Sequence, residues 1–326
     1  MNHPILQANK NCPYGGLTRE EFYQKHQLLH QEAFMLNGHN GKIFTQTWRP
    51  ASPSSELKGV VAMVHGYNSE SSWIFQLTAV AIAKLGFLAC ALDLPGHGYS
   101  EGQRGHIPTI SLVIDDCIQF FDSVRLAYGR LPAFLYGESL GGAIAMLVYL
   151  RQKAKWDGLI LNGAMCGVSA KFKPVWPLEK LLPLAALIAP NWRVTVTKPL
   201  VDMSYKEKWK RELVRRSPRA QNYEHPPAST ALEFLRICEE IGRRCGELEL
   251  PMLVLHGGED SVCDSGSAEL VYELAGSKDK TLKILPGMWH QLIGEPQETV
   301  ELGFGIIFSW LKDRAKRASL ASFNNY

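Results

Sequence analysis

The sequence predicts an α/β fold with a mostly parallel, doubly wound sheet, led by an N-terminal antiparallel hairpin and interrupted by an inserted helical cap. From residue 59 onward, short continuous apolar runs alternate with longer helical segments, a pattern typical of parallel strands covered on both faces. Before them, two strand-like segments flank the turn 37–41, which contains an Asn-Gly pair. Between about residues 166 and 241 the alternation stops, and the chain becomes helical and punctuated by proline.

Each element follows from these patterns. Thr18 begins a capped helix that we expect to reach about residue 31, and segments 33–36 and 42–48 form the hairpin. The predicted buried strands are 60–64, 87–92, 133–136, 158–161, 252–255 and 282–285. The predicted helices are 73–85, 110–128, 139–153, 264–275 and 298–316. The chain then divides into a first core part at 1–165, a cap at 166–241 and a second core part at 242–326.

The inserted segment falls between two core strands, so we expect it to cover the carboxyl edge of the sheet, where open α/β sheets bind ligands. Its apolar stretch, residues 176–190, either docks on a membrane or guides an acyl chain, or it packs against the core. A group of basic side chains lies just downstream. They form either a solvated helix face or a surface for anionic lipid or an acidic substrate, and they are Lys206, Lys208, Lys210, Arg211, Arg215, Arg216 and Arg219.

Composition allows one large domain with an insertion and argues against several functions. A chain of 326 residues with 46% hydrophobic content can enclose a sizeable core. The net charge of +3 is too close to neutrality to indicate nucleic acid as the main partner. We find neither a secretory signal nor an apolar run that would span a bilayer. The seven cysteines are scattered without metal-type spacing, so we expect a cytoplasmic protein without metal or cofactor.

The most informative motif is a Gly-x-Ser-x-Gly sequence at Gly137, Ser139 and Gly141, between a predicted strand and a predicted helix. This is the sequence form of a nucleophile elbow. The turn is sharp enough to strain the serine backbone, and a side chain at either glycine would crowd the junction. The helix that follows directs its N-terminal dipole at the reacting centre. We therefore predict Ser139 as a nucleophile, with an ordinary glycine-rich turn as the alternative.

A serine hydroxyl needs a base, and the base needs an acid that holds its tautomer. In this kind of fold the chain order is serine, then acid, then histidine. Asp260 follows the predicted strand 252–255, and we prefer it over Glu259, which belongs to the turn, and Asp264, which caps the next helix. His290 follows the last predicted strand and is the only histidine after His256. It is the predicted base, and a surface histidine is the alternative.

An oxyanion hole requires two backbone N–H donors placed around the developing negative charge. One donor is expected from Leu140, the residue after the nucleophile. The other is expected from the loop after the first parallel strand, where we choose the amide of Tyr67. His65 is expected to brace this loop by hydrogen bonds rather than to act on substrate.

These motifs together resemble the monoacylglycerol lipase-like branch of the α/β hydrolases, and in particular its plant members, which include caffeoylshikimate esterases and lysophospholipases. The resemblance begins at about Tyr14 and covers nearly the whole chain. Its carriers are His65-Gly66-Tyr67 with Ser71-Ser72-Trp73, Leu92-Asp93-Leu94-Pro95-Gly96-His97-Gly98-Tyr99-Ser100, the elbow at Ser139, the segment 256–260, and Asp279-Lys280-Thr281-Leu282-Lys283 leading to Gly287-Met288-Trp289-His290.

The resemblance implies the α/β-hydrolase fold, a triad of Ser139, Asp260 and His290, an oxyanion hole at Tyr67 and Leu140, and a helical cap whose apolar surface touches membranes. One departure concerns the alcohol. Animal members carry Gly-Glu-His after the first His-Gly-small triplet, where the glutamate helps to bind glycerol. This chain has Asn68-Ser69-Glu70 at that place, so the glycerol-binding role is not carried over.

The residues and the resemblance favour a cytoplasmic, cofactor-independent serine esterase. Its substrate would be a small-molecule ester: a monoacylglycerol, a lysophospholipid or a hydroxycinnamoyl ester such as caffeoyl shikimate. Peripheral membrane contact through the cap is expected, and nucleic acid is not. Two other functions stay open, an acyltransferase that uses the same acyl-enzyme and a small-molecule receptor built on the hydrolase fold.

Overall fold

The computed structural model describes residues 2–52, 56–129, 131–167, 178–193, 200–219 and 225–323. Within these residues the chain forms an eight-stranded sheet in the order β1-β2-β4-β3-β5-β6-β7-β8. The strands are β1 (Leu28–Leu36), β2 (Lys42–Pro50), β3 (Val60–Val64), β4 (Leu88–Leu92), β5 (Ala133–Glu138), β6 (Gly158–Asn162), β7 (Met252–Gly257) and β8 (Lys280–Leu285). The β1–β2 and β2–β4 pairs are antiparallel, and from β4 to β8 every pair is parallel. The predicted hairpin and parallel sheet are confirmed.

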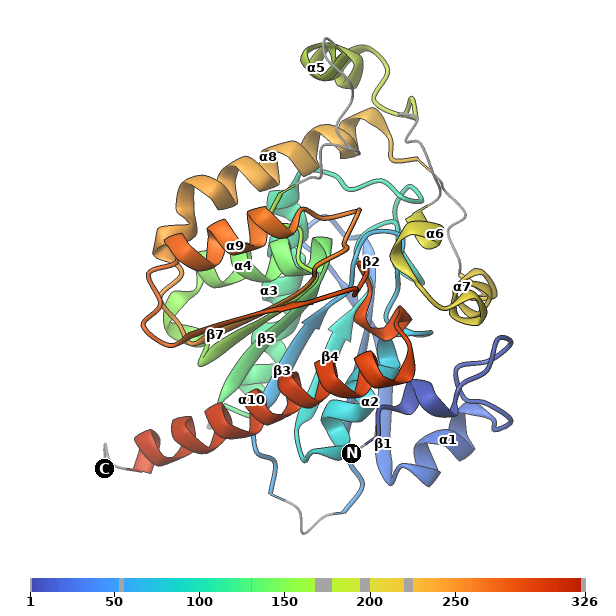
Figure 1. Cartoon of the computed structure of the whole chain (residues 1–326), viewed down its shortest axis with the longest axis vertical. Helices are drawn as coiled ribbons and strands as arrows, with labels where there is room; N and C mark the ends of the chain where they lie inside the picture. Colours follow the sequence, from blue (N-terminus) through green and yellow to red (C-terminus); the bar gives the residue numbers. More distant parts are fainter. Residues whose placement is uncertain are drawn as a thin grey trace.

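Helices cover both faces of the sheet (Figure 1). One face carries α3 (Ile110–Ala127), α4 (Leu140–Arg151), α8 (Ala228–Arg244) and α9 (Ser265–Leu274). The other face carries α2 (Phe75–Lys84) and α10 (Gln297–Phe323), with α1 (Arg19–Lys25) near the hairpin. Successive side chains of β3 alternate between these layers, because a strand has a period of two: Val60 and Ala62 enter the first layer, and Val61 and Met63 enter the second.

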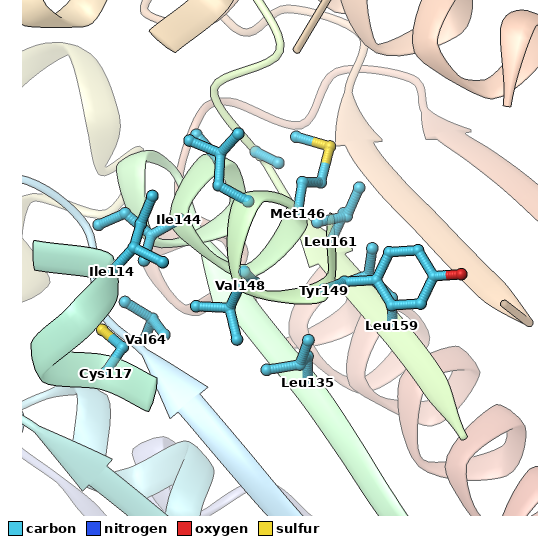
Figure 2. Close-up of a cluster of buried hydrophobic side chains, with 14 of the residues drawn as sticks. Val64, Ile114, Cys117, Leu135, Ile144, Met146, Val148, Tyr149, Leu159 and Leu161 are labelled. Atoms are coloured by element: carbon cyan, nitrogen blue, oxygen red, sulfur yellow. The ribbon is translucent and has the colours of Figure 1, made fainter. Parts of the chain in front are cut away.

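Helix α4 occupies the centre of the first layer (Figure 2). All of its residues from Leu140 to Leu150 are buried, so it lacks the polar stripe of a surface helix. In this view Ile144 lies toward Ile114 of α3, and the helix also contacts α8 and the strands β3, β5 and β6. The helix is therefore held on several sides at once, and it fixes the end of β5 from which it starts.

The predicted helix at 18–31 is only partly correct. Thr18 makes the expected capping box with Glu21, but α1 ends at Lys25 and β1 begins at Leu28. Between them Gln27 adopts a positive φ of 54°, which turns the chain back toward the sheet. Strand β1 then pairs with β2 along its whole length. This long-range pairing outweighs the local helical preference of the segment.

The inserted segment lies between β6 and β7, as predicted. Its described helices are α5 (Leu178–Ile188), α6 (Leu200–Ser204), α7 (Lys208–Arg215) and α8. Residues 168–177, 194–199 and 220–224 of the predicted cap, including positions 176 and 177 of its apolar stretch, lie outside the described residues. Helix α8 continues past the expected boundary at Ile241 and packs on the α3–α4 layer through Ile237 and Ile241. Among the described residues, no helix is both long and apolar enough to cross a membrane.

Candidate active site

Ser139 stands alone between the last residue of β5 and the first residue of α4. Its backbone is strained, with φ 54° and ψ −123°, a region that residues with a side chain rarely adopt. A Cβ at Gly137 would collide with the carbonyl of Gly141, and a Cβ at Gly141 would collide with the carbonyl of Val64. The tight turn expected of a nucleophile elbow is thus present, and both glycines are sterically required.

Three predicted side chains meet at the carboxyl edge of the sheet. The Oγ of Ser139 lies 2.9 Å from Nε2 of His290. The Nδ1 of the same imidazole lies 2.7 Å from Oδ2 of Asp260. The His290 side chain is 3% exposed and the Asp260 side chain is fully buried. A continuous hydrogen-bond chain therefore joins the hydroxyl to a buried carboxylate through one histidine.

Asp260 is held as a carboxylate by its surroundings. Its Oδ1 accepts hydrogen bonds from the backbone N–H groups of Val262 (2.8 Å) and Cys263 (3.0 Å). Burial acts to raise the pKa of Asp260, but His290 and His256 outweigh it and hold that pKa well below its usual range. His256, whose Nε2 lies 3.1 Å from Oδ2, was not assigned this role from the sequence.

The two competing carboxylates occupy other places. Glu259 is exposed in the turn. Asp264 caps α9, where its Oδ2 accepts from the backbone N–H of Ser267 at 2.9 Å. Of these three acidic residues, Asp260 is the one whose carboxylate contacts His290.

The loop after β3 packs directly against the elbow. A Cβ placed on Gly66 would lie 3.0 Å from Cβ of Ser139, so the next residue, Tyr67, begins beside the hydroxyl. Leu140 is the first residue of α4, and its N–H is one of the donors that a helix leaves without an internal partner. His65 braces the loop, because its Nε2 accepts from the backbone N–H of Leu94 at 3.0 Å and its Nδ1 lies 2.8 Å from the carbonyl of Gly66. The oxyanion hole at Tyr67 and Leu140 stays a prediction.

A cavity of about 170 Å³ opens onto Ser139 and His290 between the core and the cap. Its lining is mixed. The apolar lining comes largely from the cap and includes Leu182, Leu200, Val201, Val214, Ala231, Phe234 and Leu235. The polar lining includes Asn68, Ser69, Glu70, Tyr205, Ser217 and Gln291. Such a cavity can hold a molecule that has an apolar part and a polar part.

Two buried carboxyl groups beside the site were missed from the sequence. Glu138 hydrogen-bonds the hydroxyl of Tyr136, and burial raises its pKa to about 7. Glu70 accepts from Oγ of Ser217 in the cap at 2.8 Å, and burial together with the nearby Asp93 raises its pKa to about 7. The sequence does not indicate that either side chain is buried. Glu138 is buried by the residues beneath the elbow, and Glu70 is buried by the cap, which contributes Ser217.

The basic residues of the cap do not form a uniformly solvated face. Lys210 is buried, and its Nζ donates to the carbonyl of Glu295 at 2.5 Å. Lys206 donates to the carbonyl of Gly287 at 2.7 Å. Lys208, in contrast, is exposed. Lys206 and Lys210 therefore make contacts within the protein. The sequence had suggested only a solvated helix face or a surface for anionic lipid or an acidic substrate.

Comparison with known proteins bears on the fold and the family. A model of the family described as "Serine aminopeptidase, S33" matches residues 55–297, more than half of the chain. The chain belongs to this family. A soluble variant of monoglyceride lipase from Saccharomyces cerevisiae superposes with a TM-score of 0.74 at 21% identity, covering 88% of this chain and 94% of that one. At that identity the likeness shows the α/β-hydrolase fold and no more.

Relatives named as an esterase and as a lipase match most of this chain. A caffeoylshikimate esterase from Arabidopsis thaliana is 33% identical over 309 residues, which cover 93% of this chain and 92% of that protein. A monoglyceride lipase from Homo sapiens is 29% identical over 296 residues, which cover 88% of this chain and 92% of that protein. This S33 member is therefore a carboxylic ester hydrolase, and the resemblance to the monoacylglycerol lipase-like branch is confirmed.

Proposed function

We propose that this protein hydrolyses carboxylic esters through an acyl-enzyme formed on Ser139. His290 takes the proton of the Ser139 hydroxyl as Oγ attacks the ester carbonyl, and then gives that proton to the leaving alcohol. Asp260 holds the imidazole in the correct tautomer and stabilises the imidazolium. Water, deprotonated by His290, then attacks the acyl-enzyme, and the acid leaves with the serine restored.

The negative charge that forms on the carbonyl oxygen needs donors already in place. We assign them to the backbone N–H groups of Tyr67 and Leu140. The close packing of Gly66 on Ser139 supports this assignment, because Tyr67 directly follows Gly66 and Leu140 directly follows Ser139. A loss of one such donor typically costs about 2.7–4 kcal/mol of transition-state stabilisation.

The observation that carries the proposal is the unbroken hydrogen-bond chain from Ser139 through His290 to Asp260. The three residues come from three loops far apart in the sequence, and each loop follows a parallel strand. A strained serine backbone at the same point is the second mark of an activated nucleophile.

The substrate is proposed to be an ester with an apolar acyl group and a polar alcohol: a monoacylglycerol, a lysophospholipid or a hydroxycinnamoyl ester. The mixed apolar and polar lining of the cavity supports this class. The names of the Arabidopsis and human relatives point to two of these three substrates. We also propose that the protein works in the cytoplasm and contacts membranes through α5, where Leu184, Leu187 and Ile188 are exposed.

The test compares purified wild-type protein with Ser139→Ala on a monoacylglycerol, a lysophospholipid and caffeoyl shikimate. We expect the kcat of the variant to fall by at least about three orders of magnitude. The variant should also no longer be labelled by a fluorophosphonate, because the reactive hydroxyl is absent. Near-normal turnover by the folded variant would refute the assignment. The ranking of kcat/KM across the three esters identifies the substrate class, and ester products formed with an added alcohol would indicate acyl transfer.

A further inference from the structure

The loop that carries His290 lies at the edge of the sheet. It follows β8, which is the last strand in the sheet order and pairs only with β7 among the described strands. We call residues 286–295 the histidine loop. Support from the sheet reaches this loop from one side. The other side is covered by cap residues 204–211, which we call the clamp segment.

Backbone hydrogen bonds join the two segments next to the catalytic base. The N–H of Gln291, the residue after His290, donates to the carbonyl of Ser204 at 2.9 Å. The N–H of Glu207 donates to the carbonyl of Gly294 at 3.0 Å. A Cβ on Gly294 would lie 2.7 Å from the ring of Tyr205, so the two backbones approach as closely as glycine allows.

Two lysines of the clamp segment extend this contact to both ends of the histidine loop. Lys206 donates to the carbonyl of Gly287 at 2.7 Å, before His290. Lys210 donates to the carbonyl of Glu295 at 2.5 Å, after it. Lys210 is only 2% exposed, and burial lowers its pKa to about 8 although Glu207 and Glu295 act to raise it. A buried ammonium group is costly, so its place on this loop calls for a compensating role.

Side-chain contacts complete the arrangement within the histidine loop. The N–H of Trp289, the residue before His290, donates to Oε1 of Glu295 at 2.7 Å. The guanidinium of Arg211 lies 5.4 Å from the centre of the Trp289 ring. Both neighbours of His290 are thus tied, one through Glu295 and Arg211 and the other through Ser204.

We propose that Lys206 and Lys210 are positioning residues that hold the imidazole of His290 in line with Ser139 and Asp260. The inference rests on the role proposed for His290. It means that the contacts of Lys206 and Lys210 with the histidine loop are a fixed part of the catalytic centre and stay in place when substrate enters. Displacement of a reacting group by about 1 Å can cost about 10²-fold in rate, so a small shift of the loop is sufficient to lower turnover.

The test uses Lys206→Met, Lys210→Met and their double variant, which keep most of the unbranched side chain but remove the ammonium donors. Lys208→Met on the exposed face of α7 is the matched control. We expect the double variant to lose about 10- to 100-fold in kcat, with KM within about twofold of wild type. Lys210→Gln keeps a hydrogen-bond donor, so its kcat should be higher than that of Lys210→Met.

A second readout is independent of turnover. The downfield proton resonance of His290 Nδ1–H, which reports its hydrogen bond to Asp260, should shift or broaden in the double variant and stay unchanged in Lys208→Met. If circular dichroism shows that the double variant is unfolded, kcat and the resonance are both measured on Lys206→Met instead. Lys206 is only half-buried, so we expect this single variant to fold.

The outcomes separate the two proposals. Wild-type kcat and an unchanged resonance in a folded lysine variant would overturn the positioning role, even with Ser139→Ala inactive. Full activity of Ser139→Ala would overturn the proposed function, while the resonance would still report whether the lysines hold the imidazole.

Discussion

The carboxylate of Asp260 shows how single residues are tuned at this site. Burial opposes its charge, and the compensation comes from two backbone N–H donors and two imidazoles. Asp260 therefore stays ionised even when the pH falls below the ordinary pKa of an aspartate. Because its pKa is lower in the folded state than in the unfolded chain, this group stabilises the folded state above about pH 4 and loses that contribution as the pH falls.

Replacing Asp260 with asparagine should keep the shape and remove the charge. The amide can hold His290 in the wrong tautomer, so we expect kcat to fall by about 10⁴, as for the comparable substitution in a serine protease. Steady-state kinetics at neutral pH would measure this, with Asp264→Asn as the control that affects only a helix cap. A decrease of less than about tenfold would exclude Asp260 as the orienting acid.

Glu138 shows the opposite tuning. Its pKa is raised from 4.5 to about 7 by burial, so the folded state favours the protonated form and loses stability as the pH rises between these values. The free energy of unfolding of wild type should therefore fall by up to about 3 kcal/mol more between pH 5 and pH 8 than that of Glu138→Gln, which has no group to ionise. Urea unfolding of the variant and of wild type at both pH values measures the difference. The exposed Glu269→Gln is the control, and parallel pH profiles for Glu138→Gln and wild type would contradict the assignment.

At the scale of elements, α4 connects the core to Ser139. Its N-terminus begins directly after Ser139, and its other residues are enclosed by the sheet, α3 and α8. The packing that holds α4 (Figure 2) therefore also holds the residue from which the helix starts. Loosening the helix is expected to affect both stability and the strained serine.

Ile144→Ala tests this connection. The side chain is fully buried, so its truncation should cost about 2–5 kcal/mol in the free energy of unfolding, against about 0.5–1.5 kcal/mol for Ile144→Val. Denaturant unfolding gives both values. We also expect the alanine variant to lose activity at temperatures where wild type is unaffected. Equal stabilities for the two variants would mean that the site collapses around the gap.

At the scale of the whole molecule, the cap has two unlike parts. The α6–α7 part is tied to the core, through the clamp segment and through Trp73, whose Nε1 donates to the carbonyl of Leu213 at 2.7 Å. Helix α5 projects at the outer end (Figure 1), and its residues Leu187 and Ile188 are 79% and 74% exposed. One interpretation of this stretch was that it packs against the core. Leu187 and Ile188 do not, because both side chains are exposed.

We predict that Leu187→Glu with Ile188→Glu weakens binding to lipid vesicles and lowers activity on dispersed monoacylglycerol, while hydrolysis of a water-soluble short-chain ester stays within about twofold. Removing two buried aliphatic side chains from a membrane contact costs about 1.5–3 kcal/mol each. Vesicle co-sedimentation measures the binding. The control is Leu126→Glu, an 88% exposed leucine near the C-terminal end of α3. Equal binding by both variants would rule out α5 as the contact.

Local patterns in the sequence determined the alternation of strands and helices, the hairpin and the positions of Ser139, Asp260 and His290. They could do so because each depends on a pattern that can be seen along the chain: apolar periodicity, glycine at a tight turn, or the order in which residues follow parallel strands. The strand at Leu28 and the burial of Glu70 and Lys210 depend on segments distant in sequence. Only the tertiary structure decided them, because pairing with β2 and closure of the cap set their surroundings.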